Sequence, residues 1–311
     1  MAVTQLLKVS TTVADLERAV AFYRDGLGLA SGTLTEWDDP AWSRLLGLDP
    51  TTRARSVEVP VGGKTLELVT FDPPGAPYPA ERASNDQWFE HVALVAGDIA
   101  AVWRTLERHT PEVITAGGPD LLPPNTGSVS AFKFRDPEGH PLELISFPPG
   151  VGDPQWQNGG AGLRGYDHTA IAVTDVERSL AFYQGLLGLR VAGRSLNQGP
   201  EQERLDGLAG CVVDVVALAP TAAPTPHVEL LHYRMPEGRR APTPAAANDV
   251  AATRQIHAVD NIGEMLRRLE DAGAALVSPG LVTLSGGSRA ASVRDPDGHM
   301  LVLTDGEAFQ P

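Results

Sequence analysis

The 311-residue chain has little cysteine, no long apolar run and few basic residues. Cys211 is the only cysteine, which excludes an internal disulfide and a metal site built from several thiolates. Lys and Arg number 25 against 39 Asp and Glu, and the formal charge is −14. This balance argues against nucleic-acid binding, in which Lys and Arg neutralise phosphates. No stretch of about 18 apolar residues exists to span a membrane. We therefore expect neither nucleic acid nor a membrane as a partner.

The segment MAVTQLLKVSTT at the start lacks the basic residues, apolar stretch and cleavage site of a signal peptide, so the expected location is the cytoplasm. The length predicts two domains of roughly 150 residues each. Cys211 lies in the apolar run CVVDVVAL and is predicted to be a buried core residue. The expected partner is a small-molecule substrate, and a homodimer is an assembly that the sequence leaves open.

What the chain does contain is a doubled sequence. The segment TTVADLERAVAFYRDGLGL at 11–29 returns as IAVTDVERSLAFYQGLLGL at 171–189. Asp15 and Asp175 stand immediately before an apolar pattern of helical spacing, where an N-cap is expected. Each copy is therefore predicted to begin as a strand and to continue as a helix. The predicted helix ends are Gly28 and Gly188.

Two further segments match each other, FKFRDPEGHPLELISF at 132–147 and SVRDPDGHMLVLTDG at 292–306. Each predicts a strand, a tight Asp-Pro-x-Gly turn and a second strand, because Pro fixes φ and Gly tolerates positive φ. The segments 88–110 and 253–273 each read as a strand followed by a helix. The chain thus resolves into four modules of one strand, one helix and about three strands. A lone module would expose one face of its sheet and needs a partner.

The doubled ADLERAVAFY and TDVERSLAFY helices, the FRDPEGHPLEL and VRDPDGHMLVL turns and the strand glutamates resemble the vicinal oxygen chelate superfamily. That superfamily includes glyoxalases, extradiol dioxygenases, epimerases and bleomycin resistance proteins. The resemblance implies an α+β fold class in which four βαβββ modules form two curved-sheet cups. The predicted division is domain 1 at 1–147 with modules 5–72 and 87–147, a linker at 148–163, and domain 2 at 164–311 with modules 164–233 and 250–305.

In this superfamily, metal ligands come from the first and last strand of each module. The matching positions hold Lys8 and Glu67, then His91 and Glu143, then His168 and Glu229, and finally Arg254 and Val302. If neighbouring modules pair, neither cup has a good ligand set. If the two inner modules pair, His91, Glu143, His168 and Glu229 share one cup. Two imidazoles and two carboxylates suit one divalent ion such as Zn, Fe, Mn, Co or Ni. We favour this inner pairing, and the neighbour pairing stays open.

That ligand set favours a metal-dependent, glyoxalase-like isomerase or lyase acting on a small α-hydroxy or α-keto carbonyl substrate through a metal-stabilised enediolate. Glu143 or Glu229 is expected to take and return the proton. His227 lies two residues before Glu229 on the same strand face and is a candidate proton shuttle. The candidate catalytic residues are therefore Glu143, Glu229 and His227, and the candidate metal ligands are His91, Glu143, His168 and Glu229.

Two alternatives remain. One is an extradiol-type ring-cleavage dioxygenase. The resemblance then calls for a Tyr three residues before the turn Asp, where this chain has Lys133, with Ala291 one position further out in the fourth module. The other is a non-catalytic small-molecule binding or resistance protein, with an apolar cup lined by Trp88, Phe132 and Phe134.

The remaining charged positions have simpler interpretations. Lys8, Glu67 and Arg254 would share the other cup, where a salt-bridged structural remnant is expected because buried charges must pair. An anion-binding role is the alternative for these three. His140 and His299 follow the two turn glycines and are interpreted as turn residues.

Overall fold

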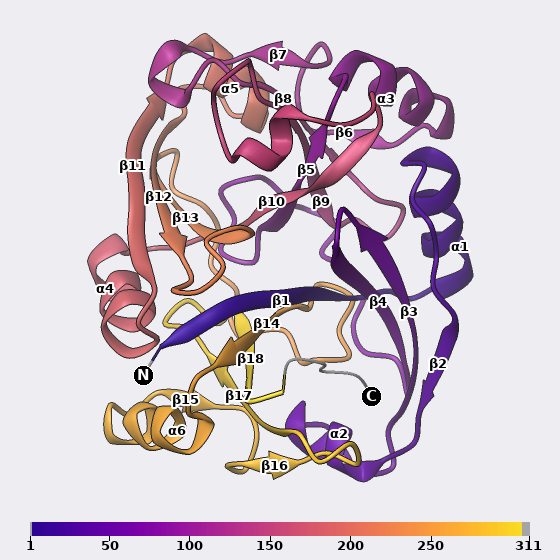
Figure 1. Ribbon diagram of the computed structural model, residues 1–311, viewed down its shortest axis with the longest axis vertical. Helices are drawn as coiled ribbons and strands as arrows, with labels where there is room; N and C mark the ends of the chain where they lie inside the picture. The colour runs from indigo at the N-terminus through magenta and orange to yellow at the C-terminus, as the bar shows by residue number, and fades with distance from the viewer. Residues whose placement is uncertain (1, 307–311) are drawn as a thin grey trace.

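The computed structural model describes residues 2–306, which form two nine-stranded sheets, one in the upper and one in the lower half of Figure 1. The first module contains β1 (Val3–Thr12), α1 (Leu16–Ala21), β2 (Leu34–Trp37), α2 (Pro40–Leu45), β3 (Arg53–Val61) and β4 (Lys64–Asp72). The second contains β5 (Glu90–Ala96), α3 (Ile99–Leu106), β6 (Glu112–Val113), β7 (Asp120–Leu121), β8 (Ser130–Arg135) and β9 (Pro141–Ser146).

The other two modules repeat this order. The third contains β10 (Leu163–Ala172), α4 (Val176–Leu180), β11 (Arg190–Gln198), α5 (Pro200–Asp206), β12 (Val212–Ala219) and β13 (His227–Met235). The fourth contains β14 (Thr253–Val259), α6 (Ile262–Asp271), β15 (Ala275–Leu276), β16 (Val282–Thr283), β17 (Arg289–Arg294) and β18 (Met300–Thr304). The predicted α+β class with two curved sheets is confirmed. No helix among the described residues is long and apolar enough to cross a membrane.

The modules pair inner with inner and outer with outer. In what we call the inner sheet, β5 of the second module runs antiparallel to β10 of the third. In the outer sheet, β1 of the first module runs antiparallel to β14 of the fourth. The strand order is β11-β12-β13-β10-β5-β9-β8-β6 in the inner sheet and β15-β17-β18-β14-β1-β4-β3-β2 in the outer sheet. The inner pairing is therefore confirmed, and the neighbour pairing is wrong.

The two repeated helices begin and end where the sequence predicts. The side chain of Asp15 accepts a hydrogen bond from the Arg18 amide, and that of Asp175 accepts one from the Arg178 amide. Each helix then widens into a π-helical turn, at Phe22–Gly26 and Ala181–Leu186. The chain leaves both helices through glycines with positive φ, Gly28 at 69° and Gly188 at 75°.

Apolar side chains on the faces that carry the helices hold the two sheets together. One core joins the first and second modules and includes Leu6, Leu94, Phe132 and Phe134, and a second core joins the third and fourth modules. The prediction that Phe132 and Phe134 line a cup is therefore wrong, because successive side chains of a strand point to opposite faces. Trp88 does not line the inner cavity either and lies instead beneath the Arg239 guanidinium, 5.7 Å from it.

The two Asp-Pro-x-Gly turns fasten one sheet to the other. Nε2 of His140, in the second module, lies 2.8 Å from the carbonyl oxygen of Thr12, in the first. Nε2 of His299, in the fourth module, lies 2.9 Å from the carbonyl oxygen of Ala172, in the third. Both imidazoles are turn residues as interpreted. Each also links its module to the preceding one, which belongs to the other sheet.

The outer cup is filled by its own side chains. Trp42 and Leu45 of α2 belong to one apolar cluster with Ile256, Met300 and Val302 of the outer sheet. Val302 stands at the position that corresponds to Glu143 and Glu229, so an apolar side chain takes the place of a metal-ligating carboxylate there.

Two buried cations also lie in the outer sheet, and their surroundings differ. Lys8 Nζ contacts Glu67 at 2.7 Å and Glu58 at 2.9 Å, as a salt-bridged remnant predicts. Arg254 departs from that prediction, because its guanidinium donates to Thr12 Oγ1, Ser10 Oγ and the carbonyl oxygen of Ala247. Burial lowers the pKa of Arg254 to about 10.

The turn histidine of the fourth module predicts a pH-dependent stability. Burial opposes protonation of His299, but the carboxylates of Asp295 and Glu90 outweigh it and raise its pKa to about 9. An unfolded histidine titrates near 6.5, so the stabilisation is complete below about pH 6.5 and is lost as the pH rises through about 9. We expect His299→Gln to lower the free energy of unfolding by about 1–3 kcal/mol at pH 6. Urea titrations at pH 6 and 9.5 would measure the difference, and an equal loss at both values would contradict this account.

Candidate functional site

Four adjacent strands at the centre of the inner sheet carry the predicted ligands. His91 on β5 stands opposite Ala170, and His168 on β10 stands opposite Ala93, so the two imidazoles are diagonal neighbours on one face. In the parallel pairings to either side, Glu143 on β9 aligns with Ala93, and Glu229 on β13 aligns with Ala170. The strand register therefore brings all four side chains to the middle of one cup.

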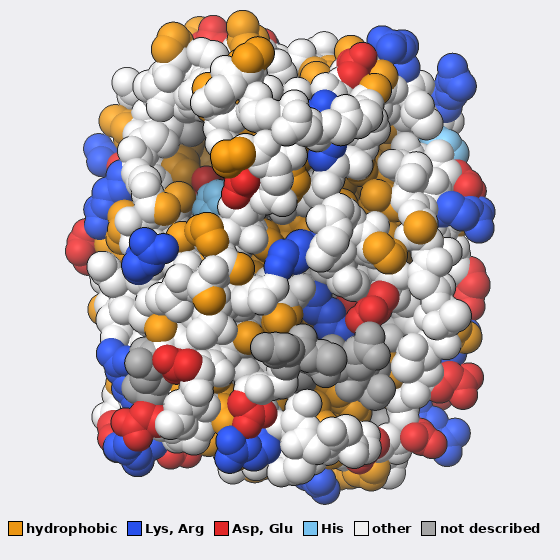
Figure 2. All heavy atoms as spheres, in the orientation of Figure 1, with side chains coloured by type: hydrophobic (Ala, Val, Ile, Leu, Met, Phe, Trp, Pro, Cys, Tyr) orange, Lys and Arg blue, Asp and Glu red, His pale blue; other side chains and the backbone are white. Residues whose placement is uncertain are grey.

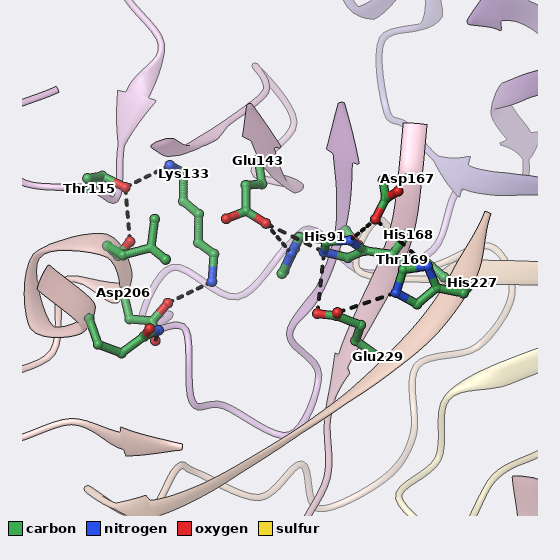
Figure 3. A network of polar contacts seen from close by, with 12 residues as sticks. His91, Thr115, Lys133, Glu143, Asp167, His168, Thr169, Asp206, His227 and Glu229 are labelled. Atoms are coloured by element: carbon green, nitrogen blue, oxygen red, sulfur yellow. Dashed lines mark hydrogen bonds and ion pairs between the residues drawn. The ribbon is translucent and has the colours of Figure 1, made fainter. Parts of the chain in front are cut away.

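The four groups meet closely (Figure 3). Nε2 of His91 lies 3.0 Å from Glu143 Oε2. Nε2 of His168 lies 3.6 Å from the same oxygen and 3.5 Å from Glu229 Oε2. The ligand atoms that His91, Glu143 and His168 offer all lie within 4.8 Å of one another, which makes these three a candidate metal-binding group. Both imidazoles and Glu143 are buried.

Asp167 is a part of the site that the sequence reasoning missed. Its Oδ2 accepts a hydrogen bond from Nδ1 of His168 at 3.1 Å, and its Oδ1 accepts one from the Trp156 indole at 2.7 Å. With Nδ1 held by Asp167, Nε2 of His168 points toward Glu143 and Glu229, where it could bind an ion after giving up its own proton. Metal-binding histidines typically have such a carboxylate behind them. The donor set and its orientation thus fit a divalent ion.

His227 lies beside this group on the edge strand of the four. Its Nε2 is 3.4 Å from Glu229 Oε1, and its Nδ1 is 3.8 Å from Asp167 Oδ2. Asp167, His168 and His227 form a second, overlapping group whose possible ligand atoms all lie within 4.8 Å of one another. The His227 side chain is 16% exposed, more than that of His168 at 6%. The position agrees with a proton shuttle, and that role stays a prediction.

A buried ion pair completes the polar floor of the cup, and the sequence reasoning missed its acidic partner. Lys133 on β8 stands opposite Glu143 on β9, and its Nζ lies 2.7 Å from Asp206 Oδ1. Asp206 is the last residue of α5, the helix of the third module that packs against β8 of the second. Thr115 Oγ1 fastens the two modules there by donating to the carbonyl oxygen of Leu205.

The electrostatics of the cup follow from these contacts. Burial opposes charging of His168, but Glu229, Asp167 and Glu143 outweigh it and raise the pKa of His168 well above its usual value. Burial together with the Lys133 charge lowers the pKa of His91. Burial opposes ionisation of Glu143, yet Lys133 and the two imidazoles hold its pKa well below the usual range. In the metal-free protein, the carboxylates of the cup thus favour the protonated forms of His168 and Lys133.

The cup opens as a cavity of about 190 Å³ above these residues. Figure 2 shows a hollow in the upper half of the molecule with apolar side chains around it and a histidine visible inside. The wall is mostly apolar, and Ser195 and Asn197 of β11 add polar groups to it. The apolar lining residues are Leu122, Val129, Ile145, Phe147, Leu205, Val213, Val215 and Leu231.

Comparison with known proteins follows the same division into repeats. The model of the Glyoxalase/Bleomycin resistance protein/Dioxygenase superfamily matches residues 5–144 and again residues 165–303. The chain belongs to this superfamily. The resemblance of its helices, turns and strand glutamates to that group is thereby confirmed, and each match spans one sequence half with two modules.

Members of the superfamily align over nearly the whole chain. A lactoylglutathione lyase of Arabidopsis thaliana is 24% identical over 308 residues, which cover 98% of this chain and 93% of that protein. Glyoxalase I from Zea mays superposes with a TM-score of 0.63 at 16% identity, covering 97% and 92% of the two chains. A candidate dioxygenase of Bacillus subtilis superposes with a TM-score of 0.61 at 15% identity, covering 97% and 85%. These structural likenesses establish the fold.

The charge distribution of the cup predicts a measurable coupling. In the metal-free protein, Glu229→Gln should lower the pKa of His168, because the Glu229 carboxylate is the strongest of the charges that raise it. The imidazole Cε1 proton resonance followed against pH would report the change. Glu67→Gln, at the corresponding position of the outer sheet, is the matched control and should leave that resonance unaffected. An unaltered His168 titration in the Glu229 variant would refute the coupling.

Proposed function

We propose that the inner cup binds one divalent metal ion and that the protein is a glyoxalase-like lyase or isomerase acting on a small α-hydroxy or α-keto carbonyl compound. The observation that carries this proposal is the convergence of His91, Glu143, His168 and Glu229 at distances of 3.0–3.6 Å, with Asp167 behind His168. The name of the Arabidopsis relative supports the lyase class.

The metal would be held by His91 and His168 through Nε2 and by Glu143, with Glu229 as the fourth ligand or as the base. A bound ion would supply Lewis-acid polarisation of the substrate's carbonyl oxygens and so favour loss of a proton from the neighbouring carbon. The residues of the chain orient the donors: Asp167 fixes the His168 ring, and the ammonium of Lys133 keeps Glu143 ionised. Two imidazoles with carboxylates suit Zn, Fe, Mn, Co or Ni.

The two glutamates have different surroundings, and we assign them different tasks. Glu143 faces both imidazoles and Lys133, and its side chain is 7% exposed. The Glu229 side chain is 20% exposed and also contacts His227. A group that must move and exchange a proton needs the looser position, so we assign the transfer to Glu229. Glu229 takes the proton from the carbon next to the carbonyl and returns it to the neighbouring carbon. His227 lies where it can relay that proton to solvent.

The cavity limits the size of the substrate. Its volume of about 190 Å³ is below the usual range for drug-sized ligands, roughly 300–1,000 Å³. Its mostly apolar wall excludes water from the reacting carbon. A compact compound of a few carbons therefore suits the cup better than a large conjugate.

Dioxygen chemistry is a second candidate, because two histidines and one carboxylate within 4.8 Å also suit Fe²⁺ with open positions. Lys133 stands where the ring-cleaving branch of the family calls for Tyr, so we rank this candidate lower. Oxygen consumption with catechols by the iron-loaded protein would favour it.

Metal analysis tests the proposal most directly. We expect elemental analysis to find about one divalent ion per purified chain and to find it lost in His91→Ala and His168→Ala, since each removes a ligand. Asp167→Asn should weaken metal binding by about 10–100-fold, because it releases the His168 ring. His232→Ala, a histidine that pairs with Asp214 outside the cavity lining, is the control and should keep the ion. If the wild-type protein is still metal-free after expression in medium supplied with Zn, Fe, Mn, Co or Ni in turn, the proposal is wrong.

The division of labour between the glutamates is tested by hydrogen exchange. With small α-hydroxy ketones in D₂O, the metal-loaded wild type should exchange the proton next to the carbonyl, detected by NMR. Glu229→Gln should slow this exchange by about 100-fold or more while the protein retains metal. Glu143→Gln should instead reduce metal content. Exchange at the wild-type rate in the Glu229 variant would show that another residue acts as the base.

A further inference from the structure

The ammonium of Lys133 has donor capacity that the protein itself does not use. Its Nζ donates to Asp206 at 2.7 Å, and this is its only side-chain hydrogen bond among residues 2–306. One side of Nζ faces the Phe89 ring, whose centroid is 5.9 Å away. The residue is 4% exposed, yet it lines the cavity. A buried ammonium has three N–H groups, and leaving one unpaired is costly.

The acidic partner of Lys133 is already well supplied with donors. Asp206 Oδ2 accepts hydrogen bonds from the Gln202 amide at 2.7 Å, from the Tyr233 hydroxyl at 3.2 Å and from the Cys211 thiol at 3.5 Å. This network holds the carboxylate in place and thereby holds Lys133 Nζ at one end of the cavity. Figure 3 shows Glu143 between Lys133 and the two imidazoles. The candidate metal-binding residues thus lie at one end of the cavity floor, and the Lys133 ammonium lies at the other (Figure 3).

We propose that Lys133 is a specificity-determining residue that donates a hydrogen bond to a third oxygen of the substrate, in addition to the two oxygens expected at the metal. This inference rests on the proposed function, and it narrows the substrate to compact polyoxygenated compounds such as hydroxylated ketones and aldehydes. Lys133 stands opposite Glu143 on the neighbouring strand, so the third oxygen would lie close to the metal-binding pair.

The charge of the cup decides between a neutral and an anionic oxygen. Glu143, Glu229, Asp167 and Asp206 are four carboxylates around the cavity, and Lys133 with a divalent ion supplies no excess of positive charge over them. A substrate carboxylate placed on Lys133 would also face Asp206, 2.7 Å from the same nitrogen. We therefore assign a neutral acceptor, a hydroxyl or carbonyl oxygen, to this position.

A pair of three-carbon probes tests the inference. Dihydroxyacetone and hydroxyacetone share one hydroxyketone unit and differ by a single hydroxyl group. Ligand-observed NMR on the metal-loaded protein should give a dissociation constant at least about tenfold lower for dihydroxyacetone, because the analogue leaves a buried donor unpaired. In Lys133→Met the two constants should become equal within about twofold. Equal constants in the wild type, or an unchanged preference in the variant, would overturn the inference.

Matched variants guard against loss of folding. Lys133→Met combined with Asp206→Asn removes both charges and should abolish the preference in the same way. Lys8→Met combined with Glu67→Gln removes a buried pair of the same 2.7 Å separation in the outer sheet, and it should keep the preference. A loss of the preference in this control as well would mean that the effect is a general one, and the inference would fall.

A second probe pair tests the neutral assignment. Malate and 2-hydroxybutyrate are four-carbon hydroxy acids that differ by a carboxylate in place of a methyl group. We expect no preference for malate that depends on Lys133, and a preference that Lys133→Met abolishes would overturn the assignment. Metal content is read separately. A metal-free wild type would reject the proposed function, while a Lys133-dependent preference for dihydroxyacetone in that protein would keep this binding role.

Discussion

The antiparallel pairing of β5 with β10 is the constraint on which the site depends. This ladder joins the second module to the third, and its register sets His91 and His168 on one face as diagonal neighbours. The parallel pairings of β9 with β5 and of β13 with β10 then fix the positions of Glu143 and Glu229 relative to the two histidines. A slip of one residue would turn an imidazole away from the cup. The chemistry of the cup is thus a property of strand register.

The two cups solve the same electrostatic problem in different ways. In the outer sheet, the position that corresponds to His168 holds Lys8, whose ammonium neutralises Glu67 and Glu58 directly. The α2 helix then fills the remaining space with Trp42 and Leu45. In the inner sheet, α5 instead places Asp206 against Lys133 in the floor of the cup and leaves a cavity that Gln202 and Leu205 help to line. The outer cup therefore carries its own cation, whereas the inner cup groups carboxylates and imidazoles around a space that an ion fits.

Much of this architecture could be predicted from the sequence, because the repeats and turns are local signals. The N-caps at Asp15 and Asp175, the glycine stops and the equivalence of the eight ligand positions all follow from the doubled segments. The inner pairing could be favoured only by asking which grouping gives a usable ligand set, since no local pattern encodes which module pairs with which. The confirmed register shows that repeat alignment carries positional information even where the residue types differ.

Other features lay beyond the sequence reasoning for physical reasons. Strand alternation points Asp167 away from the face of His168, but the ladder between β10 and β5 is irregular between Tyr166 and His168, and the carboxylate reaches the ring. Asp206 joins Lys133 across 73 residues through a helix whose docking no local pattern reveals. Phe132 and Phe134, by contrast, could have been placed correctly, because alternation around the inward-facing Lys133 sends both to the helix side.

The crossed pairing has a consequence for the integrity of the molecule. Each sequence half shares one apolar core, yet each sheet takes one module from each half. In a fragment ending near residue 150, the edge of β1 that faces β14 and the edge of β5 that faces β10 would lose their partners. Open edges of that kind invite aggregation. A nick in the connecting segment should therefore leave two pieces clasped together, and separately produced halves would have to find each other to regain the cup.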